Sequence, residues 1–274
     1  MKIVTSLQVK LTEGEQARLF TKKIKNLDAY LKVLELRSLW SAGTKESHIR
    51  YGQIAQELID MAPESETGYR ALAWHYWWLA AIGKSPKESL AKAFNLSQKA
   101  LSIEDSDPYV HCLLGTIYLY MKQYEKAIAA GKKSVELDPN GAIVHGLLGM
   151  TLSFAGRPDE AIAHLKESIR LNPFPEYWYF LRLGQAYTQK KEYEKALNEY
   201  EKAIQLSPDH FAAHVHIAAV YALLGRQEEA SNEAKKVLEL NPDFSMERTA
   251  KTLPFKDEAD LTFFVEAVRK AGLR

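Results

Sequence analysis

The sequence predicts an all-α protein, a right-handed α-α superhelix of about six helix-turn-helix repeats with flanking helices. Three observations support this fold class. Residues of one type recur at a nearly constant interval, small residues stand among large apolar residues at helical spacing, and prolines follow the second helix of each predicted pair. Each helical pair has one apolar face that it cannot bury alone, so consecutive pairs are expected to stack.

Four columns of residues show the repeat. The prolines of the first column are separated by 34, 35 and 34 residues, and the other three columns show the same intervals. The columns are Pro139, Pro173, Pro208 and Pro242; Gly115, Gly149, Gly184 and Ala218; Ala127, Ala161, Ala196 and Ala230; and Tyr118, Leu152, Tyr187 and Tyr221. Small side chains let two helices cross closely, and a proline cannot continue a helix. The pattern therefore predicts helical pairs over 108–141, 142–176, 177–210 and 211–244.

Two less regular pairs are predicted upstream, over 29–65 and 66–107. The second is longer than the repeat interval. Within it, Ser85 and Glu88 have the spacing of a capping box, and Pro86 stands between them where a first helical residue is expected. A helix is therefore predicted to begin at Pro86.

The repeat array over 29–244 is flanked by two further segments. Residues 1–25 contain apolar residues at helical spacing and predict a helical linker, which is expected to pack on the first repeats or on a neighbouring molecule. Residues 245–274 predict the capping helices that the end of a solenoid needs. The last of these helices is expected to begin after Asp257, which can cap it, and to end at Gly272.

The charge balance and the apolar runs argue against several classes of partner. Lys plus Arg (36) nearly equals Asp plus Glu (35), so no nucleic-acid or anionic membrane partner is predicted. The single cysteine, Cys112, permits neither an intrachain disulfide nor a cysteine-rich zinc site. The most apolar window, 71–83, is too short to span a bilayer, and polar residues interrupt the N-terminus too early for a signal peptide. A cytoplasmic location is expected.

No catalytic motif is present in the sequence. It contains no phosphate-binding loop, no GxSxG and no HExxH, so we predict neither an enzyme nor a cofactor. His111, His145 and His214 occupy one column of three repeats and are interpreted as packing residues. His210, His214 and His216 lie close together in sequence, and an i, i+4 pair could bind a transition metal, but at most adventitious metal binding is expected.

The repeat resembles the tetratricopeptide repeat, a 34-residue helix-turn-helix unit. In that family, one face of the first helices lines a concave groove that binds partner peptides or helices. Spacing places Arg70, Trp74, Trp77 and Trp78 on one such face, and some of these tryptophans could instead pack beneath the N-terminal helices. The resemblance implies a partner groove formed by Tyr30, Arg37, Trp40, Arg70, Trp74, Trp77, Trp78, Tyr109, Thr116, Tyr120, Phe154, Trp178, Arg182 and Gln185.

Three strings extend the resemblance to bacterial proteins of the class III adenylate/guanylate cyclase type. IVTSLQVKLTEGEQARL (3–19) is similar to the linker that leaves the TolB-like domain of those proteins. PFPEYWYFLRLGQAY (173–187) and LPFKDEADLTFFVEAVRKAGL (253–273) are similar to their tetratricopeptide array. The resemblance implies that this chain is the C-terminal regulatory or interaction part of a larger signalling protein. No cyclase catalytic segment is present, so it implies no cyclase activity.

The predicted function is therefore that of a protein-interaction or regulatory scaffold. The partner would be a helix or a hydrophobic peptide, and the chain's own N-terminal segment or a second copy of the chain are further candidates. The alternative is a sensor that binds a small molecule or short peptide in a tryptophan-lined pocket, and a defined pocket rather than an open groove would favour it.

Overall fold

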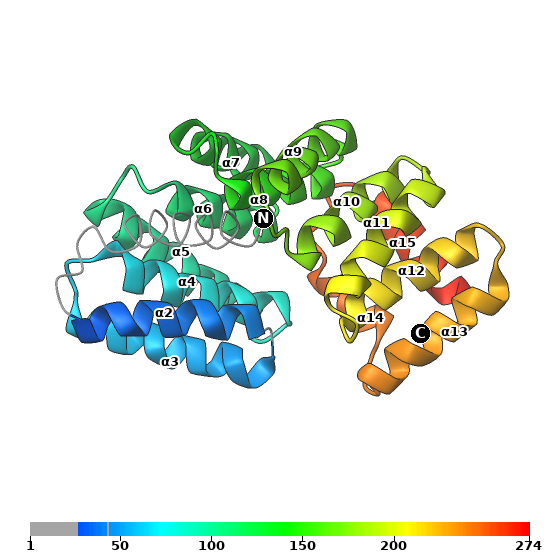
Figure 1. Cartoon of the computed structure of the whole chain (residues 1–274), viewed down its shortest axis with the longest axis horizontal. Helices are drawn as coiled ribbons and strands as arrows, with labels where there is room; N and C mark the ends of the chain where they lie inside the picture. Colours follow the sequence, from blue (N-terminus) through cyan, green and yellow to red (C-terminus); the bar gives the residue numbers. More distant parts are fainter. Residues whose placement is uncertain (1–26, 43) are drawn as a thin grey trace, which may run out of the picture. The chain divides into compact units, whose positions relative to one another are not determined.

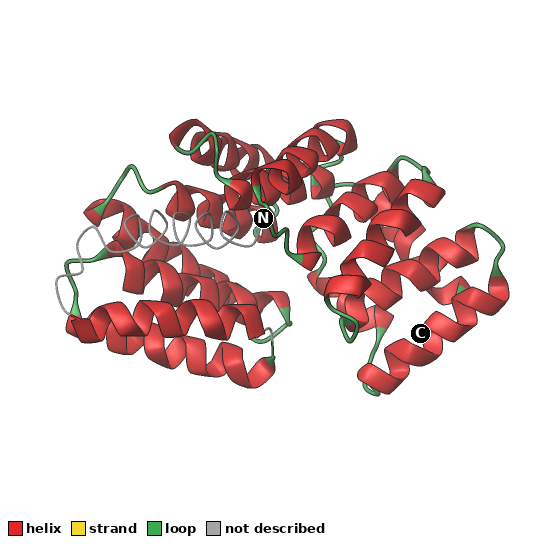
Figure 2. Ribbon diagram, viewed as in Figure 1, coloured by secondary structure: helices red, strands yellow, loops and turns green. Residues whose placement is uncertain are grey.

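The structure is a computed structural model that describes residues 27–42 and 44–274, and these residues form helices and loops without a strand (Figure 2). The predicted all-α fold class is confirmed. The chain divides into two compact units, with residues up to Ala80 and Lys84–Ser106 in unit 1 and Ala81–Gly83 and Asp107–Arg274 in unit 2. The predicted N-terminal linker, 1–25, lies outside the described residues.

Unit 1 contains four described helices, which are α2 (Leu27–Ala42), α3 (Lys45–Met61), α4 (Glu66–Ala81) and α5 (Pro86–Ile103) (Figure 1). Its core contains Val33 from α2, Ile54 and Leu58 from α3, and Leu72 from α4, with Leu96 of α5 at the edge. Along α2, the buried residues Ala29, Val33 and Leu36 recur at the three- and four-residue intervals that put side chains on one face of a helix. The helices therefore pack through one apolar face each.

The start of α5 corrects one detail of the prediction. Pro86 occupies the first turn as expected, but Ser85 makes no side-chain capping hydrogen bond. Its φ of +44° is left-handed, whereas a capping serine normally has an extended backbone. The hydroxyl of Ser89 instead donates to the carbonyl oxygen of Lys84 at 2.9 Å. The capping box predicted here is therefore wrong, and the proline alone marked the helix start correctly.

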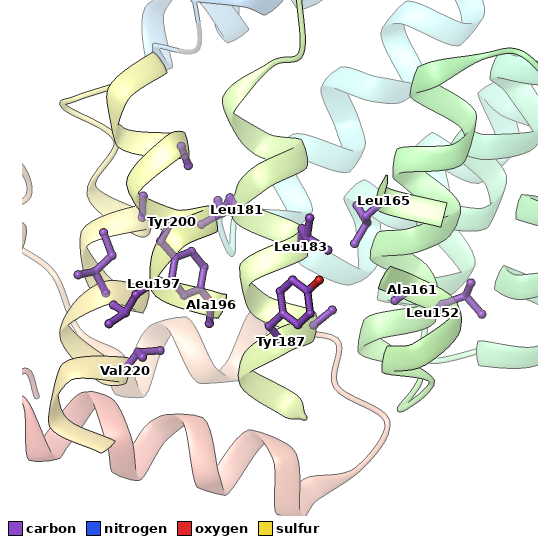
Figure 3. Packing of buried hydrophobic residues seen from close by; sticks show 14 of the residues in the cluster. Leu152, Ala161, Leu165, Leu181, Leu183, Tyr187, Ala196, Leu197, Tyr200 and Val220 are labelled. Atoms are coloured by element: carbon purple, nitrogen blue, oxygen red, sulfur yellow. The ribbon is translucent and has the colours of Figure 1, made fainter. Parts of the chain in front are cut away.

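Unit 2 begins with four helical pairs. Their helices are α6 (Pro108–Tyr120), α7 (Tyr124–Leu137), α8 (Ala142–Phe154), α9 (Pro158–Leu171), α10 (Tyr177–Gln189), α11 (Tyr193–Leu206), α12 (Phe211–Leu223) and α13 (Gln227–Leu240). Each first helix packs on the second helix that follows it, and consecutive pairs contact each other. Figure 3 shows how leucine, alanine and tyrosine side chains from consecutive helices interlock in the shared core.

The small residues stand where the helices of a pair cross, as predicted. A Cβ atom on Gly149 would lie 2.6 Å from Cγ of Leu165 and 3.1 Å from the carbonyl oxygen of Ala161. A Cβ atom on Gly115 would lie 3.0 Å from the carbonyl oxygen of Ala127. Because nearly all real Cβ contacts are longer, a larger side chain at Gly149 or Gly115 would force neighbouring atoms to shift.

The turn inside each pair of unit 2 adds a column that the sequence pattern did not reveal. The second residue past the end of each first helix has a left-handed backbone. Its φ is +58° at Lys122, +75° at Gly156, +61° at Lys191 and +76° at Gly225. These positions follow the same repeat interval. Two of the four are lysines, which adopt this conformation less readily than glycine, so the geometry of the pair imposes it.

Two further helices end unit 2, α14 (Met246–Thr252) and α15 (Glu258–Lys270). The carboxylate of Asp257 accepts a hydrogen bond from the backbone N–H of Ala259 at 2.8 Å and caps α15, and Gly272 has a φ of +99° just after its end. Both ends of the predicted final helix are confirmed. Phe264 and Val268 of α15 pack into a core shared with α12 and α13.

Candidate interaction sites

Four tryptophans of unit 1, Trp40, Trp74, Trp77 and Trp78, form what we call the tryptophan cluster. The ring of Trp74 lies 5.5 Å from that of Trp40 and 5.2 Å from that of Trp77, measured between centroids. All four side chains are half-buried. Positions 74, 77 and 78 lie on one face of α4 because residues three and four apart are neighbours on a helix. Trp40 reaches the same place from the end of α2.

The tryptophan cluster packs on the core of unit 1. Trp40 and Trp74 pack against the buried residues of α2, α3 and α4, and the ring of Trp40 lies 5.4 Å from that of the buried Tyr51. The expectation that some of these tryptophans pack against the N-terminal helices is therefore confirmed in part. Their remaining area stays accessible.

Two histidines, His48 and His75, lie beside the tryptophan cluster, and the sequence pattern did not indicate them. The ring of His48 stacks on Trp78 at 4.6 Å. The Nδ1 atom of His75 lies 2.9 Å from the carbonyl oxygen of His48 and must donate, since a carbonyl only accepts. Burial, followed by the nearby His75, lowers the pKa of His48 to about 4, and burial also lowers the pKa of His75. Both rings are therefore neutral at pH 7, and the cluster presents an uncharged aromatic surface.

The other predicted groove residues of unit 1 differ in exposure. Tyr30 and Arg37 are half-buried on α2. Arg70 is only 5% exposed, so its side chain faces the interior of the protein instead of an open groove. The prediction placed Arg70 with the tryptophans from its spacing along the helix alone. In the structure, the packing of α4 against its neighbours buries this side chain.

In unit 2, the predicted groove residues divide into two groups. Tyr109, Tyr120, Trp178 and Arg182 are half-buried and keep some accessible area. The other three are buried, with exposures of 0% for Thr116, 2% for Phe154 and 4% for Gln185. A side chain without accessible area cannot meet a partner, so direct contact by these three is not compatible with this structure.

The chain's own C-terminal segment, residues 253–274, covers part of this region. The ring of Phe255 lies 5.0 Å from that of Phe154 in an edge-on contact. The N–H of Lys256 donates to the carbonyl oxygen of Phe154 at 2.9 Å, and the Tyr124 hydroxyl donates to the carbonyl oxygen of Phe255 at 2.8 Å. Phe154 is the last residue of α8, whose carbonyl has no partner inside the helix, so the returning segment satisfies it.

Further along, α15 continues over the first helices. Phe264 stacks on His216 of α12 at 4.8 Å, and His216 stacks in turn on Tyr200 at 5.4 Å. The side chain of Gln189 joins α8 to α15, because its amide nitrogen lies 3.0 Å from the carbonyl oxygen of Ser153 and 3.3 Å from a carboxylate oxygen of Asp260. We call the surface around Tyr120, Phe154, Arg182 and His216 the first-helix face of unit 2.

Two members of the histidine column, His145 and His214, are buried packing residues as predicted. Nε2 of His145 lies 3.0 Å from the carbonyl oxygen of Pro139, and Nε2 of His214 lies 2.8 Å from that of Pro208. Each ring thus holds the loop before its own helix. Nδ1 of His145 meets Nδ1 of His164 at 3.0 Å, whereas Nδ1 of His214 meets a carboxylate oxygen of Glu233. Within residues 27–42 and 44–274, no group of three or more His, Cys, Asp or Glu side chains could hold a metal ion.

Models of the tetratricopeptide repeat match three stretches, residues 110–173, 184–225 and 211–244. The chain contains tetratricopeptide repeats. No curated protein matches the chain, and none of the matches bears on the expected relation to cyclase-type proteins, which stays a prediction. Of the helices in the described part of the chain, none is both long enough and apolar enough to cross a membrane.

Solved structures support the fold. The chain is similar to the Cut9–Hcn1 hetero-tetramer of the APC/C, with a TM-score of 0.65, 16% identity, and coverage of 86% of this chain and 45% of that chain. It is also similar to TTC0263, a thermophilic TPR protein of Thermus thermophilus, with a TM-score of 0.56, 23% identity, and coverage of 75% and 100%. The type IV pilus biogenesis factor PilW gives a TM-score of 0.55 at 17% identity, with coverage of 73% and 90%. At these identities the likeness establishes the fold alone.

Proposed function

We propose that this chain is a non-catalytic scaffold that binds a protein partner, and that the tryptophan cluster of unit 1 is its principal contact. The observation that carries the proposal is that Trp40, Trp74, Trp77 and Trp78 are only partly buried and are joined by ring contacts, with Trp78 joined to Trp40 through His48. Large aromatic rings left partly in water commonly mark interaction surfaces, and tryptophan is enriched among residues that dominate binding energy.

Two properties of the tryptophan cluster define the kind of partner. The rings hold one another in place, so little side-chain entropy is lost when a partner binds. Neutral His48 and His75 add no charge at pH 7, which favours an apolar segment over an acidic one. A partner helix or hydrophobic peptide with one apolar face fits both properties.

Unit 2 provides an internal precedent for this mode of binding. There, Phe255 and Phe264 of the C-terminal segment pack on aromatic side chains of the first helices. The similar Cut9–Hcn1 structure is a hetero-tetramer. We further propose that the natural context is a cyclase-type signalling protein, for which the strings at 3–19, 173–187 and 253–273 are the support.

The test is a comparison of partner capture by the full chain and by the double variant Trp74→Ala/Trp78→Ala. Partners captured from the source organism are identified once with the wild type and then titrated against each variant. We expect the double variant to bind them about 30-fold more weakly, which corresponds to about 2 kcal/mol.

Trp178→Ala is the matched control, because Trp178 is a half-buried tryptophan of unit 2 that packs over Gly146. It should leave binding at the tryptophan cluster unchanged. Circular dichroism must show that all variants keep their helices. Undiminished binding by a folded double variant contradicts the proposal. Unfolding of the double variant, with unchanged binding per folded molecule, assigns the tryptophans to the core and also contradicts it.

A further inference from the structure

A cavity lies between the second helices of the last two pairs of unit 2. Both α11 and α13 pack on α12, which lies between them in the chain order (Figure 1). The cavity between α11 and α13 has a volume of about 490 Å³, and the buried His214 of α12 is one of its lining residues. This volume is in the range of sites that hold a small ligand or a few side chains of a partner. No residue that defines the first-helix face lines this cavity, so it is a separate surface of unit 2.

Apolar side chains form part of the lining. Ile204, Pro208 and Leu240 contribute to it. Leu240 is the last residue of α13 and Leu206 is the last residue of α11, and both side chains are exposed to solvent. Exposed leucines at and beside a cavity offer apolar area that a partner can cover.

Three carboxylates at the cavity have no countercharge. Glu201, Asp209 and Glu239 line it, and all three residues are exposed. Among the ion pairs that residues 27–42 and 44–274 form with one another, none includes any of these three carboxylates. The cavity therefore combines apolar area with negative charge that the protein itself does not pair.

The basic groups that line the cavity are engaged by α13 and by the loop before α12. Nζ of Lys236 donates to a carboxylate oxygen of Glu233 at 3.0 Å, and the other oxygen of that carboxylate meets Nδ1 of His214. Nε2 of His214 lies 2.8 Å from the carbonyl oxygen of Pro208. Even when His214 is protonated, the negative charges around the cavity outnumber the positive ones.

The preceding helical pairs show that this negative charge is not a feature of the repeat. Lys166 stands at the position of Glu201, 35 residues earlier, and Gln205 stands at that of Glu239, 34 residues earlier. A basic and a neutral side chain thus occupy the positions that are acidic here. The charge belongs to this cavity in particular.

We propose that the cavity binds a basic, partly apolar segment of a partner protein. An apolar side chain of the segment would enter between α11 and α13, and arginine or lysine side chains beside it would face Glu201, Asp209 and Glu239. Complementary charge selects such a segment and rejects an acidic one. The stems of arginine and lysine can also lie along the exposed leucines while their charged ends meet the carboxylates. This surface is distinct from the tryptophan cluster, so the proposal does not rest on the proposed function.

The test uses the full chain and four short peptides. Acetyl-Arg-Leu-Leu-Arg-amide has both required properties. Acetyl-Gln-Leu-Leu-Gln-amide lacks the charge, acetyl-Arg-Ser-Ser-Arg-amide lacks the apolar side chains, and acetyl-Glu-Leu-Leu-Glu-amide has the opposite charge. Binding is followed by NMR through the imidazole signals of His214, which lines the cavity. The signals of His145, which occupies the same column two pairs earlier, are the internal reference.

We expect the first peptide to bind about tenfold more tightly than the glutamine peptide, because several exposed ion pairs add together. It should also bind about tenfold more tightly than the serine peptide, because leucine burial is lost there. The glutamate peptide should bind most weakly. High salt should reduce the preference over the glutamine peptide, since it screens exposed charges.

The double variant Glu201→Gln/Glu239→Gln should lose the preference for the arginine peptide over the glutamine peptide. Glu258→Gln/Glu266→Gln is the matched control, because it removes the same charge from exposed positions of α15 that do not line the cavity. This control should keep the preference. All four substituted positions are exposed, so circular dichroism should show intact helices in both variants.

Equal binding of the four peptides, no binding, or binding that leaves the His214 signals unmoved overturns the proposal. Sedimentation of the chain without peptide tests the other occupant, a second copy of the chain. We expect a monomer, and a dimer that Glu201→Gln/Glu239→Gln dissociates would assign the cavity to a second copy and also overturn the proposal. None of these outcomes affects the proposed function, because the tryptophan test concerns unit 1.

Discussion

The two units carry aromatic side chains on comparable first helices, but these side chains differ in exposure. In unit 1, Trp74 and Trp78 of α4 are only partly buried. In unit 2, Phe154 at the end of α8 is 2% exposed because Phe255 packs on it. The comparison shows that the repeat pattern places an aromatic residue on a face but does not decide whether the face is free. That depends on which other segment returns to cover it.

The difference extends to the histidines of the two units. In unit 1, burial, followed by the nearby His75, lowers the pKa of His48, which stacks on Trp78. In unit 2, the hydrogen bond with Glu233 raises the pKa of His214. Lowering the pH should therefore reduce the contribution of His48 to folding stability and favour that of His214.

The largest effect is expected from closing a helix crossing in unit 2. Gly149→Leu should destabilise unit 2 by about 4 kcal/mol, beyond the usual cost of overpacking, because the new side chain meets Leu165 and the backbone of Ala161. Thermal unfolding measures the loss. Ala129→Leu, at an exposed position of α7, adds a leucine side chain to the surface of a helix and should cost little. An unchanged melting temperature for Gly149→Leu would show that the crossing is not tight.

A somewhat smaller effect should follow from uncovering the first-helix face of unit 2. Phe255→Ala removes a ring that is 8% exposed and should cost about 3 kcal/mol, since the cavity adds to the lost burial. The control is Phe174→Ala, whose side chain is 58% exposed. Hydrogen exchange should show faster opening around Phe154 in the first variant and not in the second. Equal stability of the two variants would mean that the C-terminal segment contributes nothing to this face.

The smallest effect concerns pH. His48 has a folded-state pKa of about 4 against an ordinary value of 6.5, so the folded state favours the neutral ring. Its contribution is present above pH 6.5 and is lost as the pH falls towards 4, which amounts to about 2 kcal/mol at pH 5. In His48→Gln, the stability difference between pH 7 and pH 5 should shrink by about that amount.

His214→Gln is the matched control for the pH effect. Its raised pKa means that the contribution of His214 is fully present below its unfolded pKa and is lost as the pH rises. Urea unfolding at pH 7 and at pH 5 measures both variants. If the two substitutions change the stability difference between pH 7 and pH 5 in the same direction, the opposite pKa shifts assigned to His48 and His214 are wrong.

The sequence by itself determined the features that depend on neighbours along the chain. The columns around Gly149 and Ala161 located the helix crossings because a repeating unit must meet the same steric limit each time. Asp257 and Gly272 located the ends of α15 because caps act within one helical turn. The i, i+3, i+4 spacing placed Trp74, Trp77 and Trp78 on one face for the same local reason.

Only the tertiary structure decided which of these faces are open and how their groups are paired. Phe154 is buried by a segment that lies far away along the chain, and periodicity carries no information about such a return. Arg70 is buried by side chains that several helices bring together. Burial and ionisation depend on all neighbours in space at once, whereas a sequence pattern reports only those on the same helix or in the same column of repeats.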